Sequence, residues 1–319
     1  MKSGSTTSPD EQPLNLRSWL YIPGDNDSKL AKADGSGADA IVLDLEDSVA
    51  ENNRPAARRK VREFLDARPV EGRKYQAWVR INAFDESAMI DLAAVVGGTP
   101  DGIVLPKING PADVERLGYC LDALEARDAV QPGHIKIVAV ATETPVAVLR
   151  LSEFAVAHPA RLVGLNWGAE DLSAAIGAAT NVDSSGQWAL TYRWIRSAIL
   201  LAAKAANVQA IETAYVDYRD SEGLRTSCRA AAQEGFTGRA AIHPDQVAPI
   251  NESFAPSMED VALARKIVDA VERAGGTVGI EGKMYDIAHL KRARKLLALH
   301  ERYNAENLRK AGPGDRGLL

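Results

Sequence analysis

Eight short apolar runs, rich in β-branched residues, alternate along the chain with longer stretches of helical periodicity. Strands that alternate with helices pair in parallel, and continuously apolar strands need helices to cover them. Eight such units within about 250 residues are what a (β/α)8 barrel requires, whereas an open doubly wound sheet usually has fewer strands. We therefore predict an α/β fold of the (β/α)8 or TIM-barrel type, with strands at 18–22, 40–45, 77–82, 102–106, 135–141, 162–166, 208–212 and 239–243.

The stretches between these runs are rich in good helix formers. Two further helical stretches follow the eighth run and are surplus to a barrel, so we expect a C-terminal extension that packs over the barrel or onto another subunit. Helices are expected at 54–67, 111–127, 145–157, 188–206, 221–234, 259–273 and 286–303. The predicted organisation is a disordered tail at 1–15, a catalytic barrel domain at 16–257, a helical extension or lid at 258–303 and a mobile tail at 304–319.

The segment 35–40 fits the spacing G-x-G-x-x-A of dinucleotide-binding loops. Such a loop must follow a strand and open a helix, whereas this segment precedes the run 40–45. We interpret it as the end of a helix that leads into a strand, which argues against a dinucleotide-binding fold.

The charge of the chain limits its partners. The 319 residues carry a net charge of −5, whereas nucleic acids and anionic membranes require a basic surface. No apolar stretch approaches the roughly 18 residues of a membrane span, so neither nucleic acid nor membrane is an expected partner. Cys120 and Cys228 fall in expected helices and suggest no disulfide framework or metal pair, so a reducing cytoplasm is expected.

Polar side chains follow the ends of most of the predicted strands. In a barrel, the carboxyl ends of the strands converge on one mouth, so residues far apart in the sequence can meet there. A mouth this acidic, with one arginine, favours a hard divalent cation. The residues so placed are Asp44, Glu46, Asp47, Arg80, Asn82, Lys107, Glu143, Glu170, Asp171, Glu212 and His243.

Several of these residues also have purely structural explanations. Asp171 starts a helical stretch and could be its N-cap, and Glu143 stands just before another helix, whose dipole it could complement. For His243, a satisfied core histidine is the favoured interpretation. Arg80 is harder to explain structurally, because a buried guanidinium without a partner is costly.

Eight strings run in order over most of the chain: RSWLYIPGDN (17–26), VLDLEDSV (42–49), RIN (80–82), LPK (105–107), ATETP (141–145), NWGAEDLSAAIG (166–177), GFTGRAAIHPDQVAPINESFAPS (235–257) and EGKMYD (281–286). In these strings the chain resembles the citrate lyase β-subunit-like branch of the HpcH/HpaI aldolase and citrate lyase family. Their length and specificity make chance a poor explanation.

The resemblance implies a Mg²⁺-dependent enzyme that makes or breaks a carbon–carbon bond next to a thioester. Its substrate class would be a 3-hydroxyacyl-CoA, such as malyl-CoA, citramalyl-CoA or a citryl thioester, which yields a 2-oxo acid and acetyl-CoA through an enolate. The sequence does not distinguish Mg²⁺ from Mn²⁺. Relatives usually form trimers or double trimers, so a homotrimer or hexamer is expected.

Matched by motif position, Glu143 and Asp171 correspond to the metal carboxylates, and Arg80 to the arginine that grips the oxo acid. Asp44 and Glu46 match acids that order the site. A guanidinium is suited to this grip because its planar fork binds a carboxylate through two hydrogen bonds, which a lysine cannot do.

Further matches concern coenzyme A and the extension. Arg17, Tyr21, Pro23 and Lys29 fall in the segment that contacts the CoA nucleotide in the family. Asp286 corresponds to an acid that, in some relatives, reaches a neighbouring subunit's active site. The acid–base residue is expected to be Asp286 in trans or Glu46.

The chain departs from the family at two positions. Tyr285 stands where Val is frequent, and Glu212 stands where Asp is common. The second departure creates two Glu-Thr pairs, TETP and IETA, and spacing alone leaves open which Glu binds metal. Glu143 is preferred because the proline that follows it matches the family string.

Three other functions fit the same residues. The site could be a free-acid aldolase that acts on hydroxy-oxo acids, or a thioesterase that hydrolyses malyl-CoA. The chain could instead be a subunit that binds an acyl-carrier protein within a citrate lyase complex. The identity of the acyl group stays open, because one methyl group in a pocket is worth only about 1–3 kcal/mol.

Overall fold

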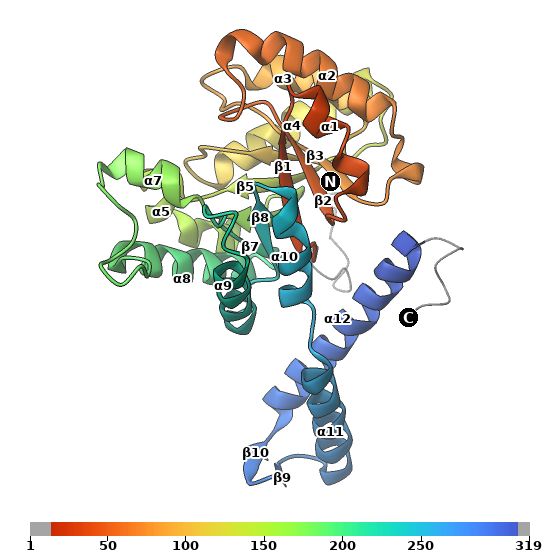
Figure 1. Ribbon diagram of the computed structural model, residues 1–319, viewed down its shortest axis with the longest axis vertical. Coiled ribbons are helices and arrows are strands. Elements are labelled where there is room, and N and C mark those ends of the chain that lie inside the picture. Colours follow the sequence, from red (N-terminus) through yellow and green to blue (C-terminus); the bar gives the residue numbers. More distant parts are fainter. Residues whose placement is uncertain (1–13, 312–319) are drawn as a thin grey trace, which may run out of the picture. The chain divides into compact units, whose positions relative to one another are not determined.

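The computed structural model describes residues 14–311, and the chain divides into two compact units, Met1–Asn251 and Glu252–Leu319. In the first unit, eight parallel strands close into a barrel in which β1 pairs with both β2 and β8 (Figure 1). The predicted (β/α)8 barrel is confirmed. The strands are β1 (Ser18–Pro23), β2 (Ala40–Asp44), β3 (Gln76–Arg80), β4 (Gly102–Leu105), β5 (Lys136–Val140), β6 (Leu162–Asn166), β7 (Gln209–Glu212) and β8 (Gly238–Ala241).

Most of the expected barrel helices are present with small shifts of their ends. These are α2 (Arg54–Asp66), α4 (Pro111–Arg127), α8 (Leu190–Ala205) and α9 (Ser221–Glu234). The structure also contains short helices that were not among the predicted ranges: α1 (Asp27–Leu30), α3 (Ala88–Val95), α7 (Ala169–Ile176) and α10 (Val247–Phe254). It further contains the 3₁₀ turns η1 (Ala33–Gly35), η2 (Glu51–Asn53), η3 (Val70–Gly72), η4 (Val96–Gly98) and η6 (Pro244–Gln246).

The expected helix 145–157 is broken into three pieces. They are α5 (Pro145–Leu149), η5 (Leu151–Glu153) and α6 (Phe154–Ala157). The break falls at Arg150, whose backbone leaves helical geometry (φ −105°, ψ 6°) while its guanidinium pairs with Glu153 at 2.8 Å within the new turn.

The segment 35–40 forms no phosphate-binding loop. The turn η1 ends at Gly35, Gly37 has a φ of +72°, and β2 begins at Ala40. The interpretation of this segment as a helix end that leads into a strand is confirmed, because the left-handed φ is one that glycine adopts without strain.

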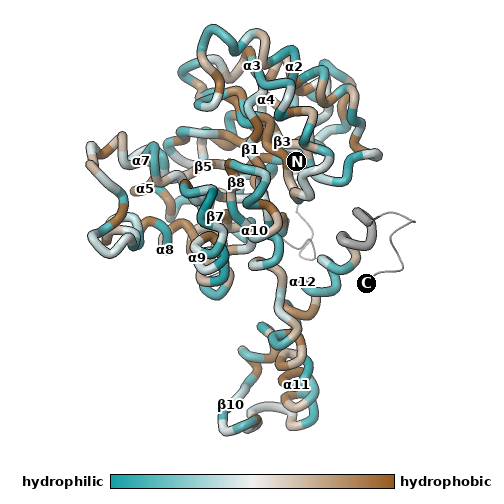
Figure 2. Tube along the Cα trace, viewed as in Figure 1, coloured by the Kyte–Doolittle hydropathy of each residue, from teal (hydrophilic) through white to brown (hydrophobic). Residues whose placement is uncertain are grey.

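Side chains on each strand alternate between the barrel interior and the helix layer, and one inward set fills the middle of the barrel. The indole rings of Trp19 and Trp78 pack with centroids 5.0 Å apart. Gly102 leaves the room they need, since a Cβ there would lie 2.1 Å from the Trp78 ring. Figure 2 shows the central strands as largely hydrophobic, with mixed helices around them. The core residues are Leu16, Trp19, Ala40, Val42, Trp78, Val104, Val138, Val140 and Ile211.

The same alternation decides which polar residues reach the mouth. Tyr21, Asp44 and Arg80 each stand two residues after an inward core residue, so they continue inward at the carboxyl ends of β1, β2 and β3. Asp44 and Arg80 are direct neighbours in the β2–β3 register. By contrast, Glu212 follows the inward Ile211 by one residue and turns toward the helix layer.

The second unit contains α11 (Met258–Ala274), an antiparallel hairpin of β9 (Val278–Ile280) and β10 (Lys283–Tyr285), and α12 (Ile287–Ala311). The two helices pack through their own small core of Ala264, Ile267, Val271, Leu290 and Ala293. The hairpin was not predicted, although its turn contains Glu281 and Gly282, both at positive φ, as two-residue hairpin turns require.

The predicted tails are only partly described. Residues 1–13 and 312–319 lie outside the described residues. The expected C-terminal tail begins at residue 304, but α12 continues through Ala311. Residues 304–311 are therefore helical. Nowhere in the stretch 14–311 is a helix both long and apolar enough to cross a membrane.

A buried ion pair fixes the connection between α4 and β5. Glu125 is fully buried, contacts the Arg161 guanidinium at 2.8 and 2.6 Å, and accepts backbone hydrogen bonds from Gly133 and Ile135. Burial raises the pKa of Glu125, but Arg161 and the two backbone donors outweigh burial and hold the pKa below its ordinary value of 4.5.

We expect Glu125→Ala to lower the free energy of unfolding at pH 7 by about 3 kcal/mol, because the buried Arg161 loses its buried carboxylate partner and keeps only the exposed Asp122 and the Ile135 carbonyl. Since the folded pKa of Glu125 is depressed, its stabilisation is present above about pH 4.5 and is lost as the pH falls below that value. Urea unfolding at pH 7 and at pH 4 checks both statements, and the difference between variant and wild type should shrink at pH 4. An equal difference at both values would contradict the ion-pair explanation.

Candidate active site at the barrel mouth

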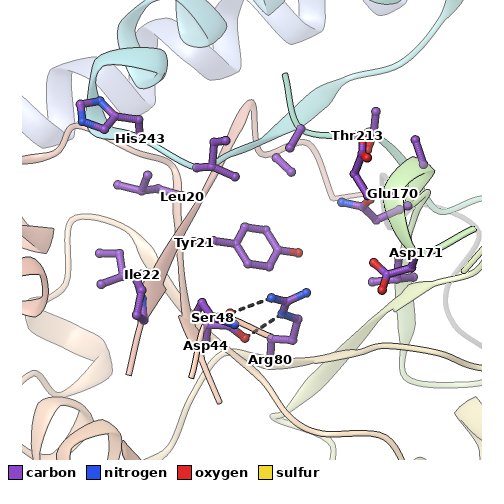
Figure 3. Close-up of a pocket in the computed structure, with 18 of the residues that line it drawn as sticks. Leu20, Tyr21, Ile22, Asp44, Ser48, Arg80, Glu170, Asp171, Thr213 and His243 are labelled. Carbon is purple, nitrogen blue, oxygen red and sulfur yellow. Dashed lines mark hydrogen bonds and ion pairs between the residues drawn. The ribbon is translucent and has the colours of Figure 1, made fainter. Parts of the chain in front are cut away.

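The first unit has a cavity of about 510 Å³ at the carboxyl ends of its strands (Figure 3). It brings together nine of the residues that the sequence placed at the mouth or assigned to substrate binding. They are Tyr21, Pro23, Lys29, Asp44, Arg80, Glu143, Glu170, Asp171 and His243. The cavity therefore forms the candidate active site.

A paired carboxylate and guanidinium form one wall of the cavity. Asp44 contacts Arg80 through two hydrogen bonds, Nε to Oδ1 at 2.7 Å and Nη2 to Oδ2 at 2.6 Å, drawn as dashed lines in Figure 3. Burial raises the pKa of Asp44, but the Arg80 charge and its hydrogen bonds outweigh burial and keep it low. The Tyr21 ring lies beside the guanidinium, 5.1 Å from its carbon. Arg80 is thus held in one orientation at the cavity.

Behind this wall, a second acid links Arg80 to a lysine. Glu46 is fully buried, and its Oε2 contacts Arg80 Nη1 at 2.9 Å while its Oε1 contacts Lys107 Nζ at 2.6 Å. Lys107 also contacts Asp47 at 3.0 Å. Burial raises the pKa of Glu46, and the charges of Arg80 and Lys107 oppose that rise. Neither Glu46 nor Lys107 lines the cavity itself.

Glu143 is buried at the cavity with only 4% of its surface exposed. Its Oε2 accepts the backbone N–H of Lys107 at 2.5 Å, and within the described residues no cationic side chain pairs with it. Burial, and then the negative charges of Glu46 and Asp171, raise its pKa to about 8. The negative charge of the Glu143 carboxylate therefore has no ion-pair partner among the described side chains.

The capping explanation of Asp171 is wrong, and Glu143 has a contact beyond its place before α5. Asp171 lies inside the first turn of α7, whose N-cap is Gly168, so Asp171 is not the cap. The N-cap of α5 is Thr144, whose hydroxyl accepts the N–H of Ala147 at 3.0 Å. Glu143 instead points to the cavity and to Lys107. Figure 3 shows Asp171 and Glu170 on the side of the cavity opposite His243.

Glu212 does not belong to the mouth, which corrects its predicted position. It is fully buried in the helix layer, where it contacts Arg196 Nε at 2.6 Å, lies 3.8 Å from Arg239, and accepts the Trp167 indole N–H at 2.5 Å. Its charge is already compensated by two guanidinium groups. The reason is the strand phase, because Glu212 ends β7 on an outward position.

His243 is not a core histidine, contrary to the favoured interpretation. Its side chain is 39% exposed, its ring stacks on Tyr218 at 4.7 Å, and its Nδ1 accepts the N–H of Asp245. It lines the cavity where β8 passes into η6. Glu170 is exposed and accepts a hydrogen bond from Asn181 at 2.8 Å.

The residues predicted to contact coenzyme A do not all come together. Tyr21, Pro23 and Lys29 line the cavity, whereas Arg17 precedes β1 at the opposite, amino end of the barrel. Arg17 is 4% exposed and contacts Asp39 at 2.8 and 2.9 Å. Arg17 therefore links the start of β1 to the start of β2 and does not line the cavity.

Asp286 belongs to the second unit, between β10 and α12. Its carboxylate accepts the backbone N–H of Ala288 at 2.9 Å and contacts His289 Nδ1 at 2.7 Å. The His289 side chain and backbone hold the pKa of Asp286 below its ordinary value. Its side chain is 46% exposed.

The sequence model of the HpcH/HpaI aldolase/citrate lyase family matches residues 17–244, which include every residue that lines the cavity. The chain belongs to this family. The predicted relationship to the citrate lyase β-subunit-like branch is confirmed by the relatives described next.

Two relatives and one solved structure define the place of the chain within the family. A citrate lyase subunit beta-like protein of Mycobacterium tuberculosis is 34% identical over 289 residues, 89% of this chain and 97% of that protein. An L-malyl-CoA/β-methylmalyl-CoA lyase of Cereibacter sphaeroides is 33% identical over 311 residues, 91% and 96% of the two chains. The crystal structure of CitE from M. tuberculosis with magnesium, acetoacetate and coenzyme A superimposes with a TM-score of 0.73, at 32% identity over 90% of this chain and 98% of that one.

Several cavity residues were not predicted from the sequence. Ser48 donates its hydroxyl to Asp44 Oδ2 at 2.5 Å, and Thr213 follows the outward Glu212, so it turns into the cavity. The strand phase could have identified Thr213, since it is the next residue after an outward position. The other unpredicted polar or aromatic lining residues are Lys32, Asn166 and Trp167.

Gly168 gives Glu143 the space it occupies. A Cβ at Gly168 would lie 2.8 Å from Glu143 Cγ and 3.3 Å from its Oε1. We expect Gly168→Ala to displace the Glu143 carboxylate and lower kcat/KM by about 100-fold, the cost of a misplacement of roughly 1 Å at a reacting centre.

A matched control is Gly118→Ala within α4, where the new Cβ would meet only Arg161 Cδ at 3.9 Å. Steady-state assays of both variants, at equal thermal stability, check the prediction. Equal activity of the two variants would contradict the role given to Gly168.

Proposed function

We propose that the chain is a Mg²⁺-dependent carbon–carbon lyase that cleaves, or in reverse forms, a 3-hydroxyacyl-CoA thioester. The products of cleavage would be a 2-oxo acid and acetyl-CoA. One observation carries this proposal: a single cavity joins Glu143, which has no cationic partner among the described residues, and Asp171 to the guanidinium of Arg80. Support comes from a malyl-CoA lyase relative and from a structural neighbour bound to magnesium, acetoacetate and coenzyme A.

The acids present fit a magnesium ion. Mg²⁺ takes oxygen ligands, keeps several waters and needs only one or two protein carboxylates, and Glu143 and Asp171 would supply them. The pKa of Glu143 is raised by burial and by neighbouring acids, which a cation would offset. Glu212, the other candidate, is already compensated by Arg196 and Arg239. The bound ion would act as a Lewis acid on the oxygens of the substrate.

Arg80 would bind the carboxylate of the oxo acid. A guanidinium has five N–H donors; Arg80 donates two to Asp44, and its Nη1 forms an ion pair with Glu46 at 2.9 Å, which leaves one N–H on each terminal nitrogen for a substrate. The remaining two can form a fork toward a bound carboxylate. The two acids fix the plane of the guanidinium before the substrate arrives, so its binding requires little reorganisation.

Coenzyme A would bind at the rim formed by β1 and α1. Lys29 and Lys32 line the cavity there, and both can meet the phosphates of the nucleotide. Tyr21 and Pro23 add apolar surface from the end of β1. Arg17 takes no part, because it is buried against Asp39 at the other end of the barrel.

The acid–base group must take the hydroxyl proton of the substrate and protonate the enolate carbon. Glu46 is poorly suited, because Arg80 and Lys107 engage both of its oxygens and it does not reach the cavity. Asp286 has an exposed carboxylate on the extension. We propose that Asp286 acts in the site of a neighbouring subunit, in a homotrimer or a hexamer.

The test is an assay of the purified full chain with Mg²⁺ and, separately, malyl-CoA, citramalyl-CoA and citryl-CoA. We expect at least one of them to yield acetyl-CoA with glyoxylate, pyruvate or oxaloacetate, and chelation of the metal to stop the reaction. Release of free CoA with an intact hydroxy acid would instead indicate a thioesterase. Cleavage of hydroxy-oxo acids without CoA would indicate an aldolase, and three intact thioesters would contradict the lyase.

Partner dependence and assembly need a separate measurement. Size-exclusion chromatography of the chain alone, followed by the same assay, should show an active oligomer. An inactive chain that becomes active only with an acyl-carrier protein would favour a subunit of a citrate lyase complex. Mixing inactive Asp286→Ala chains with inactive Glu143→Gln chains should restore activity if Asp286 acts in trans.

A further inference from the structure

Lys107 has a backbone conformation that its position in the fold does not explain. Its φ is +51°, in the left-handed region that residues other than glycine rarely adopt. Among the described residues, five other non-glycine residues share a positive φ, and each follows a helix or a 3₁₀ turn or lies in a hairpin turn, where such geometry is ordinary. They are Thr99, Ala129, His158, Asn207 and Glu281. Lys107 instead lies two residues after β4, at the barrel mouth.

The left-handed turn aims the backbone at Glu143. The N–H of Lys107 donates to Glu143 Oε2 at 2.5 Å. On the other side, Gly168 leaves space for the same side chain, since a Cβ there would lie 3.3 Å from Oε1. Glu143 is therefore held between a backbone donor and a glycine, with one oxygen engaged by Lys107.

The side chain of Lys107 contacts two acids other than Glu143. Its ammonium contacts Glu46 Oε1 at 2.6 Å and Asp47 Oδ1 at 3.0 Å. Glu46 in turn contacts Arg80 Nη1 at 2.9 Å through its other oxygen. One residue outside the cavity thus contacts both the proposed metal carboxylate and the acid behind the proposed substrate arginine.

We propose that Lys107 is a positioning residue with two separable parts. Its left-handed backbone orients Glu143 for the cation, and its ammonium balances the charge of Glu46 so that Arg80 keeps two donors for the oxo acid. The inference rests on the proposed function. Such strain is retained where surrounding structure enforces it, and it is often found at functional sites.

Two substitutions separate the backbone part from the ammonium part. Lys107→Gly and Lys107→Val both remove the ammonium, but only glycine adopts the left-handed conformation without strain. Valine is β-branched and strongly disfavours it. A difference between these variants therefore reports the backbone alone, and a difference between Lys107→Gly and wild type reports the ammonium.

Calorimetric titration of the full chain with Mg²⁺ alone tests the backbone part. We expect the Kd of Lys107→Gly to stay within about threefold of wild type and that of Lys107→Val to rise at least tenfold. The matched control is Ala129→Val, which places valine at another exposed left-handed position, φ +54°, after α4. It should lose stability and keep the wild-type Kd for Mg²⁺.

Titration with pyruvate at saturating Mg²⁺ tests the ammonium part. Lys107→Gly should bind pyruvate about tenfold more weakly than wild type, because Glu46 then relies on Arg80 alone and competes for its free donors. Lys107→Arg, which keeps the positive charge, should recover part of that affinity. Wild-type pyruvate affinity in Lys107→Gly would overturn this part.

Equal Mg²⁺ affinity in Lys107→Gly and Lys107→Val would overturn the backbone part while leaving the proposed function intact. If Lys107→Val does not fold, Lys107→Ala replaces it, and its Kd should exceed that of Lys107→Gly; equal values would again overturn the inference. Absence of Mg²⁺ binding in the wild-type chain would instead overturn the proposed function, and this inference with it.

Discussion

Glu143→Gln is expected to abolish measurable Mg²⁺ binding and to lower kcat/KM by about 1000-fold. The change preserves the volume of the side chain and its hydrogen bond to the Lys107 N–H, but removes the negative charge that would hold the cation. Calorimetry and steady-state assays measure the two effects. Retention of wild-type Mg²⁺ affinity would show that Glu143 is not a ligand.

The same variant is expected to be more stable than the metal-free wild type at high pH. The pKa of Glu143 rises from its ordinary 4.5 to about 8 in the fold, so the folded chain holds the proton more tightly than the unfolded chain. Wild-type stability from this group is complete below pH 4.5 and is lost as the pH rises through 8. Glu143→Gln lacks this loss, so its advantage should be near zero at pH 4 and on the order of 4 kcal/mol at pH 8.

Glu212→Gln is the matched control, because the same chemical change falls on the other Glu-Thr pair of the sequence. Here we expect unchanged Mg²⁺ affinity and a loss of about 3 kcal/mol in stability, since Arg196 and Arg239 lose a buried anionic partner. Opposite signs in the two variants are the expected result. A stability loss in both would contradict the view that the Glu143 charge lacks compensation.

Arg80→Lys is expected to lower kcat/KM by about 100- to 1000-fold although it conserves the charge. Lysine cannot keep the double hydrogen bond to Asp44, the contact to Glu46 and a fork toward the substrate at once. The loss should appear both as weaker pyruvate binding, measured by calorimetry, and as a lower kcat.

Arg68→Lys is the control for Arg80→Lys. Arg68 contacts Asp34 on a partly exposed surface away from the mouth, where such pairs contribute about 0–1 kcal/mol. Its activity should equal that of wild type. Comparable activity in Arg80→Lys would remove Arg80 from the proposed substrate site.

The barrel could be predicted because its strands are continuous apolar runs. Each strand is buried on both faces, against the helix layer and against the barrel interior, so both sets of its side chains are apolar. Asp44 and Arg80 could be placed at the mouth because they end such runs in the inward phase. Glu212 ends a similar run and was placed there too, yet it points outward. The sequence shows where a strand ends but not its phase, and one residue of phase exchanges the two faces.

Other features depend on geometry that has no signature in the sequence. Lys107 stands in the string LPK, and lysine has no preference for a left-handed backbone, so its contact with Glu143 could not be anticipated. The sequence favours Glu143 over Glu212 only through the proline that follows it, whereas the structure distinguishes the two acids by their partners. The hairpin 278–285 could have been predicted from the sequence, because Gly282 stands between two short runs of strand-forming residues.

The central claim is that Glu143 and Asp171 share one divalent cation that faces Arg80. A crystal of the full chain soaked in Mn²⁺ and pyruvate, measured for anomalous scattering, tests it most directly. We expect one strong peak within about 2.2 Å of a carboxylate oxygen of each acid, with pyruvate between the ion and the Arg80 guanidinium. A cavity without a peak, or a peak bound by Glu212 instead, would contradict it.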